Sequence, residues 1–152
     1  MSALGAANTI DLSFLFLGAV TPPKSTLRLT MLDSAVKTIE TGMLARRMIE
    51  LAEDKQAHEI VLLDIRTQST IADYFVICSA DNDRQIKAIV DHIDVKVHQE
   101  FGVVGRSEGS SETGWIVLDY GDIVAHVFSA AQRDYYRLER LWSKIPPVVV
   151  VQ

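Results

Sequence analysis

The first two-thirds of the chain shows apolar residues in two patterns, one helical and one typical of buried strands. Residues 34–57 repeat apolar positions at helical spacing and predict a helix, which Gly42 should break or weaken. Residues 60–65 and 73–79 are nearly continuous apolar runs, typical of strands covered on both faces. An amphipathic helix is predicted over 81–101, capped by Asp81 or Ser79 and ended by Gly102.

The last third predicts a loop, a hairpin and a final helix. Residues 105–113 are rich in Gly, Ser and Glu and read as a loop, with a short strand considered at Val103–Val104. Two β-branched runs then flank Asp119-Tyr120-Gly121-Asp122, which predicts a β-hairpin. Residues 130–143 form the predicted last helix, with three large side chains facing inward: Leu138, Leu141 and Trp142. Pro146-Pro147 is expected to end the fold.

This order of elements predicts an α/β protein with a single mixed β-sheet flanked by helices. We expect one domain over residues 31–145 and a C-terminal tail over 146–152. Residues 1–30 are interpreted as a poorly ordered N-terminal extension, or as translation from a start upstream of Met31. Their apolar stretch is not interpreted as a signal peptide, because no Lys or Arg precedes it and an acid abuts it.

Composition excludes several classes of function. The net charge of −5 argues against a general nucleic-acid binder, which normally carries a basic excess. The single cysteine, Cys78, lies in an apolar run and is expected to be a buried thiol in a reducing compartment. No apolar run approaches the ~20 residues of a membrane-spanning helix, so no membrane association is expected.

Enzyme chemistry finds little support in the residue spacing. The chain has no phosphate-binding loop motif, and no cofactor is predicted. A metal-dependent nucleotidyltransferase needs two carboxylates on one face of a strand, whereas Asp119 and Asp122 are three apart and straddle a turn. His126 could act as a base, but no nucleophile motif accompanies it. A histidine bonded across the hairpin to an acid or a carbonyl is the preferred interpretation, and no metal site is predicted.

The hairpin is better interpreted as a binding surface. Between Ser107 and His126 there is no Lys or Arg, while four acids and the aromatic residues Trp115 and Tyr120 fall in that window. Aromatic anchors with a rim of one charge are typical of a protein–protein hot spot and predict a basic partner. The alternative, that Trp115 belongs to the core, stays open. Strand alternation predicts that Trp115, Val117 and Asp119 share a partly exposed face, with Ile116 and Leu118 buried.

The last helix offers a second set of charges. Arg133, Arg137, Arg140 and Lys144 recur at three- and four-residue spacings and could form a basic stripe for RNA or phosphate. Because Asp134 and Glu139 interrupt the run, a solvated face with local ion pairs is the preferred interpretation.

Several separate motifs together resemble the ribosome-silencing factor family, also called Iojap-like. They are Ala72-Asp73-Tyr74-Phe75-Val76-Ile77-Cys78-Ser79, Arg84-Gln85, Trp115-Ile116-Val117-Leu118-Asp119-Tyr120-Gly121-Asp122, His126-Val127-Phe128 and Tyr136 to Trp142. The resemblance runs in order from about residue 35 to 143. Ala125 departs from it, because the family often has a bulkier aliphatic residue there.

The resemblance implies a binding protein without catalytic activity. It implies a nucleotidyltransferase-like fold without the catalytic acids, binding to the large ribosomal subunit through ribosomal protein L-fourteen, a block on small-subunit joining and repression of translation. It also implies a homodimer when free and a bacterial cytoplasmic location, with organellar relatives acting in large-subunit assembly. The partner-binding residues carried over are Trp115, Ile116, Asp119, Tyr120, Asp122, His126 and Tyr136. The alternatives are a large-subunit assembly factor and a nucleotidyltransferase.

Overall fold

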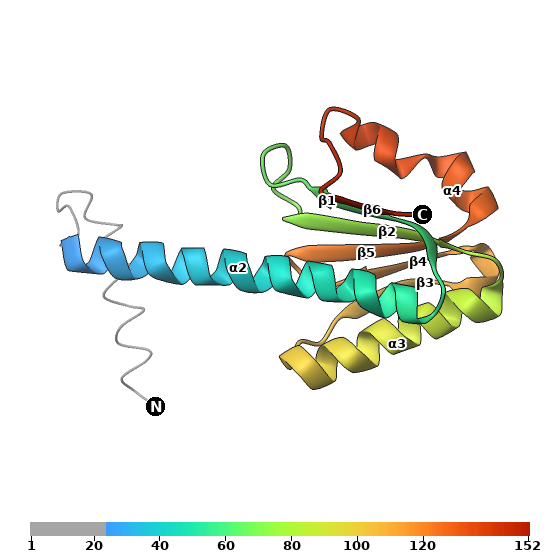
Figure 1. Ribbon diagram of the computed structural model, residues 1–152, viewed down its shortest axis with the longest axis horizontal. Helices are drawn as coiled ribbons and strands as arrows, with labels where there is room; N and C mark the ends of the chain where they lie inside the picture. The colour runs from blue at the N-terminus through green and yellow to red at the C-terminus, as the bar shows by residue number, and fades with distance from the viewer. Residues whose placement is uncertain (1–23) are drawn as a thin grey trace. The chain divides into compact units, whose positions relative to one another are not determined.

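The structure, a computed structural model, describes residues 24–152 (Figure 1). Two compact units divide the chain between Thr38 and Ile39, and helix α2, Lys24–Asp54, spans that boundary. The helix therefore begins before the predicted residue 34, and Gly42 does not break it, so that prediction is wrong. Most of the expected N-terminal extension lies outside the described residues, and its last residues, from Lys24 onward, are helical.

The body, residues 39–152, is built on one mixed six-stranded sheet, which confirms the predicted fold class (Figure 1). The strands are β1 His58–Asp64, β2 Tyr74–Ala80, β3 Arg106–Ser110, β4 Trp115–Asp119, β5 Ile123–Ser129 and β6 Val149–Val151. Their order is β3-β4-β5-β2-β1-β6. All neighbouring pairs are antiparallel except β2 and β5, which are parallel. No helix among residues 24–152 is long and apolar enough to cross a membrane.

Helices cover one face of this sheet with the larger core. Helix α3, Asp83–Phe101, buries the predicted apolar face against it: Ile86, Ile89, Val90, Ile93 and Val97. Its N-cap is Asn82, whose side chain accepts a hydrogen bond from the Gln85 amide, so the predicted caps Asp81 and Ser79 are wrong. Gly102 ends the helix in the left-handed conformation, as predicted. The part of α2 from Thr41 onward packs into the same core.

The other face carries a smaller, more aromatic core under a short helical segment. Helix α4, Ala130–Tyr136, is followed by the 3-10 helix η2, Leu138–Trp142, because Arg137 between them adopts a left-handed conformation with φ 46°. The predicted single helix over 130–143 is therefore wrong. Leu138 and Trp142 pack inward as predicted, whereas Leu141 is exposed.

Two segments predicted to lack regular structure extend the sheet. The expected loop over 105–113 contains edge strand β3 and a 3-10 helix η1, Ser111–Thr113, and no strand forms at Val103–Val104. The expected tail contributes β6, which pairs with β1 beyond the two prolines. Both strands are short and β3 is wholly exposed, so neither shows the strong apolar pattern that identifies a buried strand.

Two glycines, Gly109 within strand β3 and Gly121 in the β4–β5 turn, give a matched test of the β3–β4 pairing. Both have positive φ, +94° at Gly109 and +84° at Gly121. A Cβ on Gly109 would lie 2.3 Å from the Trp115 carbonyl oxygen, whereas a Cβ on Gly121 meets nothing within 4 Å.

We therefore expect Gly121→Ala to lower the free energy of unfolding by about 1 kcal/mol, the cost of the left-handed backbone alone. Gly109→Ala should cost about 2–4 kcal/mol, because the β3–β4 pairing must also shift. Denaturant unfolding of both variants measures the difference, and equal losses would contradict the tight β3–β4 approach.

Candidate binding surface on the β4–β5 hairpin

The predicted hairpin is present, and its turn is held by short local hydrogen bonds. Strands β4 and β5 pair antiparallel, with Trp115 opposite Phe128 and Asp119 opposite Val124. The Tyr120 amide donates to the Ile123 carbonyl at 2.9 Å, and the Gly121 amide donates to Asp119 Oδ1 at 2.8 Å. One oxygen of the Asp119 carboxylate thus shapes the turn.

Side chains of β4 alternate between the two faces of the sheet as predicted. Ile116 and Leu118 are buried in the larger core, whereas Trp115, Val117 and Asp119 are partly exposed on the other face. This arrangement confirms the prediction that Trp115 is partly accessible. The indole packs against the smaller core and also reaches the surface.

Three aromatic neighbours hold the Trp115 ring. Its Nε1 donates a hydrogen bond to His126 Nδ1 at 3.3 Å, and its ring stacks on Phe128 with centroids 4.8 Å apart. The Tyr136 ring, at the end of α4, lies 4.7 Å away and is about half exposed. Trp115 is therefore fixed in place on its buried side before any partner arrives.

The neighbouring edge strand extends this surface. Because residues directly opposite each other share a face of the sheet, Arg106 lies beside Asp119, Glu108 beside Val117 and Ser110 beside Trp115. All five residues of β3 are exposed. We define the Trp115 patch as Arg106, Glu108, Trp115, Val117, Asp119 and Tyr136. The charges of the Trp115 patch are mixed, because Arg106 adds a positive charge beside Glu108 and Asp119. Arg106 lies just before the segment from Ser107 to His126, which contains no Lys or Arg.

The structure separates two of the predicted contact residues from this patch. Ile116 and Tyr120 point to the opposite face, where Tyr120 packs against the larger core. Its hydroxyl donates to Asp94 Oδ1 at 3.1 Å, and burial together with that carboxylate raises the pKa of Tyr120. Asp122 lies in the turn, where its carbonyl accepts hydrogen bonds from the Asp73 and Tyr74 amides.

His126 lies beneath the patch and is not accessible from it. The ring is buried, contacts Phe75 edge-on at 5.0 Å, and accepts the Trp115 hydrogen bond. The hydrogen-bond partner of His126 across the hairpin is thus the Trp115 indole, so the prediction of an acid or a carbonyl is wrong. Burial lowers the pKa of His126 to about 4, so the ring is neutral at pH 7. Cys78 is also buried, as predicted, and burial raises its pKa to about 12.

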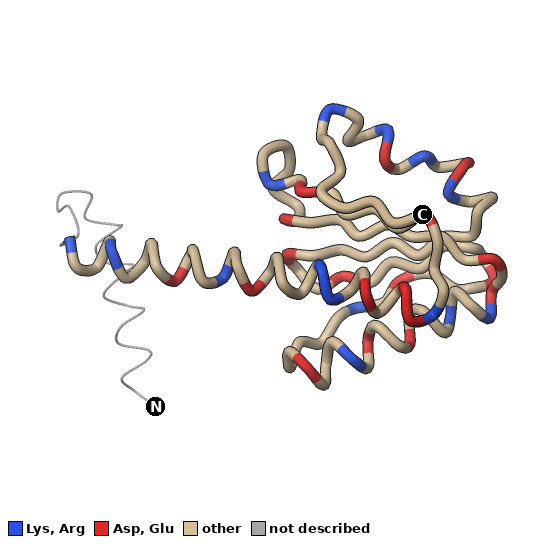
Figure 2. Tube along the Cα trace, viewed as in Figure 1, with Lys and Arg blue, Asp and Glu red and all other residues tan. Residues whose placement is uncertain are grey.

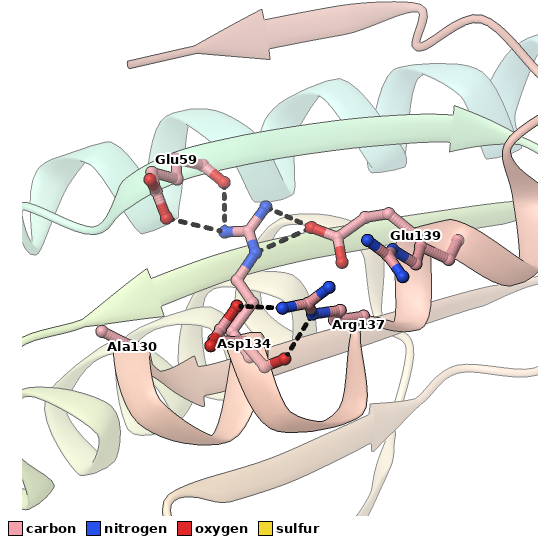
Figure 3. A pocket seen from close by; sticks show the side chains of 7 residues that line it. Glu59, Ala130, Asp134, Arg137 and Glu139 are labelled. Atoms are coloured by element: carbon pink, nitrogen blue, oxygen red, sulfur yellow. Dashed lines mark hydrogen bonds and ion pairs between the residues drawn. The ribbon is translucent and has the colours of Figure 1, made fainter.

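A hollow beside α4 is the second candidate site. It has a volume of about 470 Å³ and is lined by charged side chains from β1, α4 and η2 (Figure 3). Arg133 pairs with Glu139 at 2.6 Å, and Arg137 pairs with Asp134 at 3.3 Å. These lining charges largely neutralise one another, which supports the preferred interpretation of local ion pairs. The alternative interpretation, a basic stripe along one helix, is not realised, because α4 ends before Arg137.

Arg133 ties this segment to the sheet. Its guanidinium is mostly buried, donates to Glu139 from Nε at 2.7 Å, and donates from Nη1 to the Glu59 carbonyl and to Ser79 Oγ. Glu59 lies at an irregularity of β1 and has a left-handed backbone, φ 49°, which presents its carbonyl to Arg133. The ion pair with Glu139 spans the turn at Arg137 and so fixes the end of α4, where Tyr136 lies.

Known proteins identify the fold and the family. The family described as "Ribosomal silencing factor during starvation" matches residues 37–152. The chain belongs to this ribosomal silencing factor family. The match includes β6, so the resemblance extends beyond the residue 143 expected from the motifs.

The proteins similar to this chain include bacterial silencing factors and a mouse protein. The ribosomal silencing factor of Halalkalibacterium halodurans is 39% identical over 106 residues, which cover 69% of this chain and 90% of that protein. That of Bacillus subtilis is 40% identical over 94 residues, covering 62% and 80%. A mouse protein named "Mitochondrial assembly of ribosomal large subunit protein 1" is 27% identical, covering 63% of this chain and 43% of that protein.

Two solved structures share the silencing factor fold. A Chromobacterium violaceum protein is 34% identical with a TM-score of 0.64, covering 67% of this chain and 85% of that one. A Bacillus halodurans protein is 36% identical with a TM-score of 0.61, covering 71% and 98%.

The buried His126 predicts a pH dependence of folding in this protein. Its pKa is about 4 when folded, against the ordinary 6.5, so the unfolded chain binds the proton more readily between these values. The neutral His126 therefore contributes fully to the free energy of unfolding above pH 6.5. As the pH falls toward 4, about 3 kcal/mol of this free energy should be lost.

Urea unfolding between pH 4 and 7 measures this slope. His126→Gln, which keeps a hydrogen-bond acceptor but does not titrate, should flatten it. His98→Gln removes an exposed histidine from α3 and is the matched control. An unchanged slope in His126→Gln would show that other groups cause the acid sensitivity.

Arg133 should control the order of the α4–η2 segment. Arg133→Met leaves Glu139 without its partner, and we expect it to lower the free energy of unfolding by about 2–4 kcal/mol. The rate of amide hydrogen exchange over residues 130–142 should rise, because the ion pair that links Arg133 to Glu139 across Arg137 is lost. Arg47→Met is the matched control. It removes a bidentate ion pair with Glu100, between α2 and α3 and away from residues 130–142. Equal exchange over 130–142 in both variants would contradict the role of Arg133.

Proposed function

We propose that this protein binds the large ribosomal subunit through the Trp115 patch, at ribosomal protein L-fourteen. The bound protein occupies space that the small subunit needs and so represses translation. The mechanism is steric and requires no catalysis. Family membership and the bacterial relatives support a role at the ribosome in the bacterial cytoplasm. Ribosomal protein L-fourteen as the contact comes from the resemblance in the sequence motifs.

The observation that supports this proposal most is the position of the Trp115 ring. It is partly exposed, yet it contacts three other rings, those of His126, Phe128 and Tyr136. A rigid aromatic ring with an exposed edge is typical of a hot-spot anchor, because little conformational entropy is lost when a partner covers it. An interface of ~800 Å² per partner is sufficient when it contains such anchors.

The charges around the ring suit a basic partner. Glu108 and Asp119 flank Val117 on the exposed face, while Arg106 adds one positive charge at the end away from Trp115. Complementary rim charges chiefly raise the association rate and set the orientation of docking. A partner surface with basic residues opposite Glu108 and Asp119 would therefore associate faster and dock in one orientation.

A second candidate function uses the same contact. The mouse relative is named for assembly of the mitochondrial large subunit, so this chain could act while the large subunit is being built. Cells depleted of the protein distinguish the two roles. Loss of a silencing factor should raise the fraction of joined ribosomes during starvation, whereas loss of an assembly factor should accumulate large-subunit precursors during growth. We further propose that the free protein is a homodimer.

Removal of either patch aromatic should weaken binding to the large subunit. We expect wild-type protein to sediment with the large subunit, and Tyr136→Ala or Trp115→Ala to weaken binding about 30-fold or more, the cost of losing a hot-spot side chain. Tyr136 is half exposed, so Tyr136→Ala should leave the melting temperature nearly unchanged. Leu141→Ala, which removes an exposed apolar side chain of η2 outside the patch, is the matched control.

Sucrose-gradient profiles with purified subunits measure this binding. Wild-type levels of binding by Tyr136→Ala and Trp115→Ala would exclude the patch as the docking surface. Calorimetry with nucleotide and magnesium tests the alternative class, and heat of binding would support a nucleotidyltransferase.

A further inference from the structure

The segment from α4 to the turn after η2 carries an excess of positive charge in an acidic protein. Residues 130–145 contain four basic and two acidic residues, a net charge of +2, whereas the whole chain carries −5. Figure 2 shows Lys and Arg at several points along this segment, which lies over one face of the sheet. An anionic partner is therefore attracted to this segment and repelled by the net negative charge of the remaining chain.

Two of the four cations are already neutralised by acids of the same segment, in the ion pairs Arg133–Glu139 and Arg137–Asp134. The excess charge therefore belongs to Arg140 and Lys144. Both side chains are exposed, and neither pairs with an acid among residues 24–152. A partner can bind these two charges without breaking an ion pair of the fold.

Packing beneath η2 fixes the backbone that carries Arg140. Leu138 and Trp142, on either side of it in the sequence, pack against the smaller core. Arg140 stays exposed and lines the hollow beside α4, as does Arg137 (Figure 3). Lys144 follows four residues later, in the turn after η2. At Arg140, only the side chain must be ordered when an anion binds, which lowers the entropic cost of binding.

An exposed aromatic ring connects these cations to the Trp115 patch. Tyr135 is 78% exposed, and its ring contacts the Tyr136 ring edge-on with centroids 5.0 Å apart. Because Tyr136 belongs to the Trp115 patch, the two surfaces are continuous. Cations beside an exposed aromatic ring are typical of surfaces that bind RNA, where cations meet phosphates and rings stack on bases. We define the basic patch as Tyr135, Arg140 and Lys144.

We propose that the basic patch binds the phosphate backbone of ribosomal RNA beside the protein to which the Trp115 patch docks. This inference rests on the proposed function, which brings the protein to the large subunit. The acids Glu108 and Asp119 lie on β3 and β4, whereas the basic patch lies on α4, η2 and the following turn. One continuous surface thus offers acids to a basic protein and cations to RNA. Phosphate contacts orient a protein without reading sequence.

Removal of the two unpaired cations tests this contact. We expect Arg140→Gln with Lys144→Gln to weaken binding to the large subunit about 10-fold at about 0.1 M KCl. The slope of log K against log [KCl] should become shallower by about 1.4–1.8, because each lost phosphate contact removes about 0.7–0.9. The melting temperature should stay unchanged, since neither side chain has an acidic partner among residues 24–152.

Arg46→Gln with Arg84→Gln is the matched control. It removes the same charge from exposed residues of α2 and α3, the helices that cover the other face of the sheet. Binding and its salt dependence should therefore change far less than in the double variant of the basic patch. An equal change in both double variants would show that net charge alone is responsible and would overturn the proposal.

Binding to isolated ribosomal protein L-fourteen separates this proposal from the proposed function. Arg140→Gln with Lys144→Gln should bind the isolated protein as tightly as wild type, whereas Trp115→Ala should bind it more weakly. Equal losses on the isolated protein and on the large subunit would show that the basic patch contacts protein instead of RNA. Failure of wild type to bind the isolated protein would contradict the proposed contact of the Trp115 patch. The salt dependence is measured on the whole subunit and tests the basic patch in either case.

A photoreactive amino acid in place of Ser143, which is exposed between Arg140 and Lys144, identifies the partner directly. On purified large subunits, the proposal predicts crosslinks from position 143 to ribosomal RNA. The same amino acid in place of Gln99, an exposed residue of α3, should give none. Crosslinks from position 143 to ribosomal proteins alone would overturn the proposal.

Discussion

The unequal covering of the two faces of the sheet is the constraint on which the candidate site depends. On one face α3 and the second half of α2 bury alternate side chains of every central strand. On the other face α4 and η2 cover only part of the sheet, where Phe75 meets Trp142. Strands β3 and β4 extend past this cover, and the side chains that point to that face stay partly or fully exposed. Trp115 lies at the border between the covered and the uncovered parts.

That border explains why the same residue belongs to the core and to the surface. Trp115 stacks on buried Phe128 and donates to buried His126, so the inward part of its ring supports the fold. The remaining part, with Tyr136, is open to a partner. Arg133 supports this arrangement indirectly, because its hydrogen bonds to β1, β2 and η2 hold the helix end that carries Tyr136. A binding surface assembled in this way is preorganised by the packing beneath it.

Strong periodic signals made most of the fold predictable from sequence. The buried strands β1 and β2, helix α3 and the β4–β5 hairpin follow from apolar runs, a helical face and a Gly-containing turn. The edge strands β3 and β6 could not be predicted in this way, because strand β3 is polar and exposed, and β6 is three residues long. The end of α4 could not be predicted, because it depends on a left-handed Arg137, a conformation that the residue type does not indicate.

The site was predictable in part. Strand alternation correctly placed Trp115, Val117 and Asp119 on one partly exposed face and Ile116 on the other. The contribution of Arg106 and Glu108 could not be predicted, because it requires the register of an unrecognised strand. The hydrogen bond from Trp115 to His126 could not be predicted either, because an acid or a backbone carbonyl is the more ordinary partner of a strand histidine. Tyr120 looked like a surface aromatic in the turn, but its contact with Asp94 on α3 depends on tertiary structure.

The most direct test of the central claim is site-specific photocrosslinking on purified large subunits. A photoreactive amino acid replaces Val117, in the middle of the Trp115 patch, or Val95, an exposed apolar residue of α3. The proposed docking predicts a crosslink from position 117 to ribosomal protein L-fourteen, identified by mass spectrometry, and none to that protein from position 95. Crosslinks to it from position 95 and none from position 117 would contradict the account, because the protein would then dock through its α3 face.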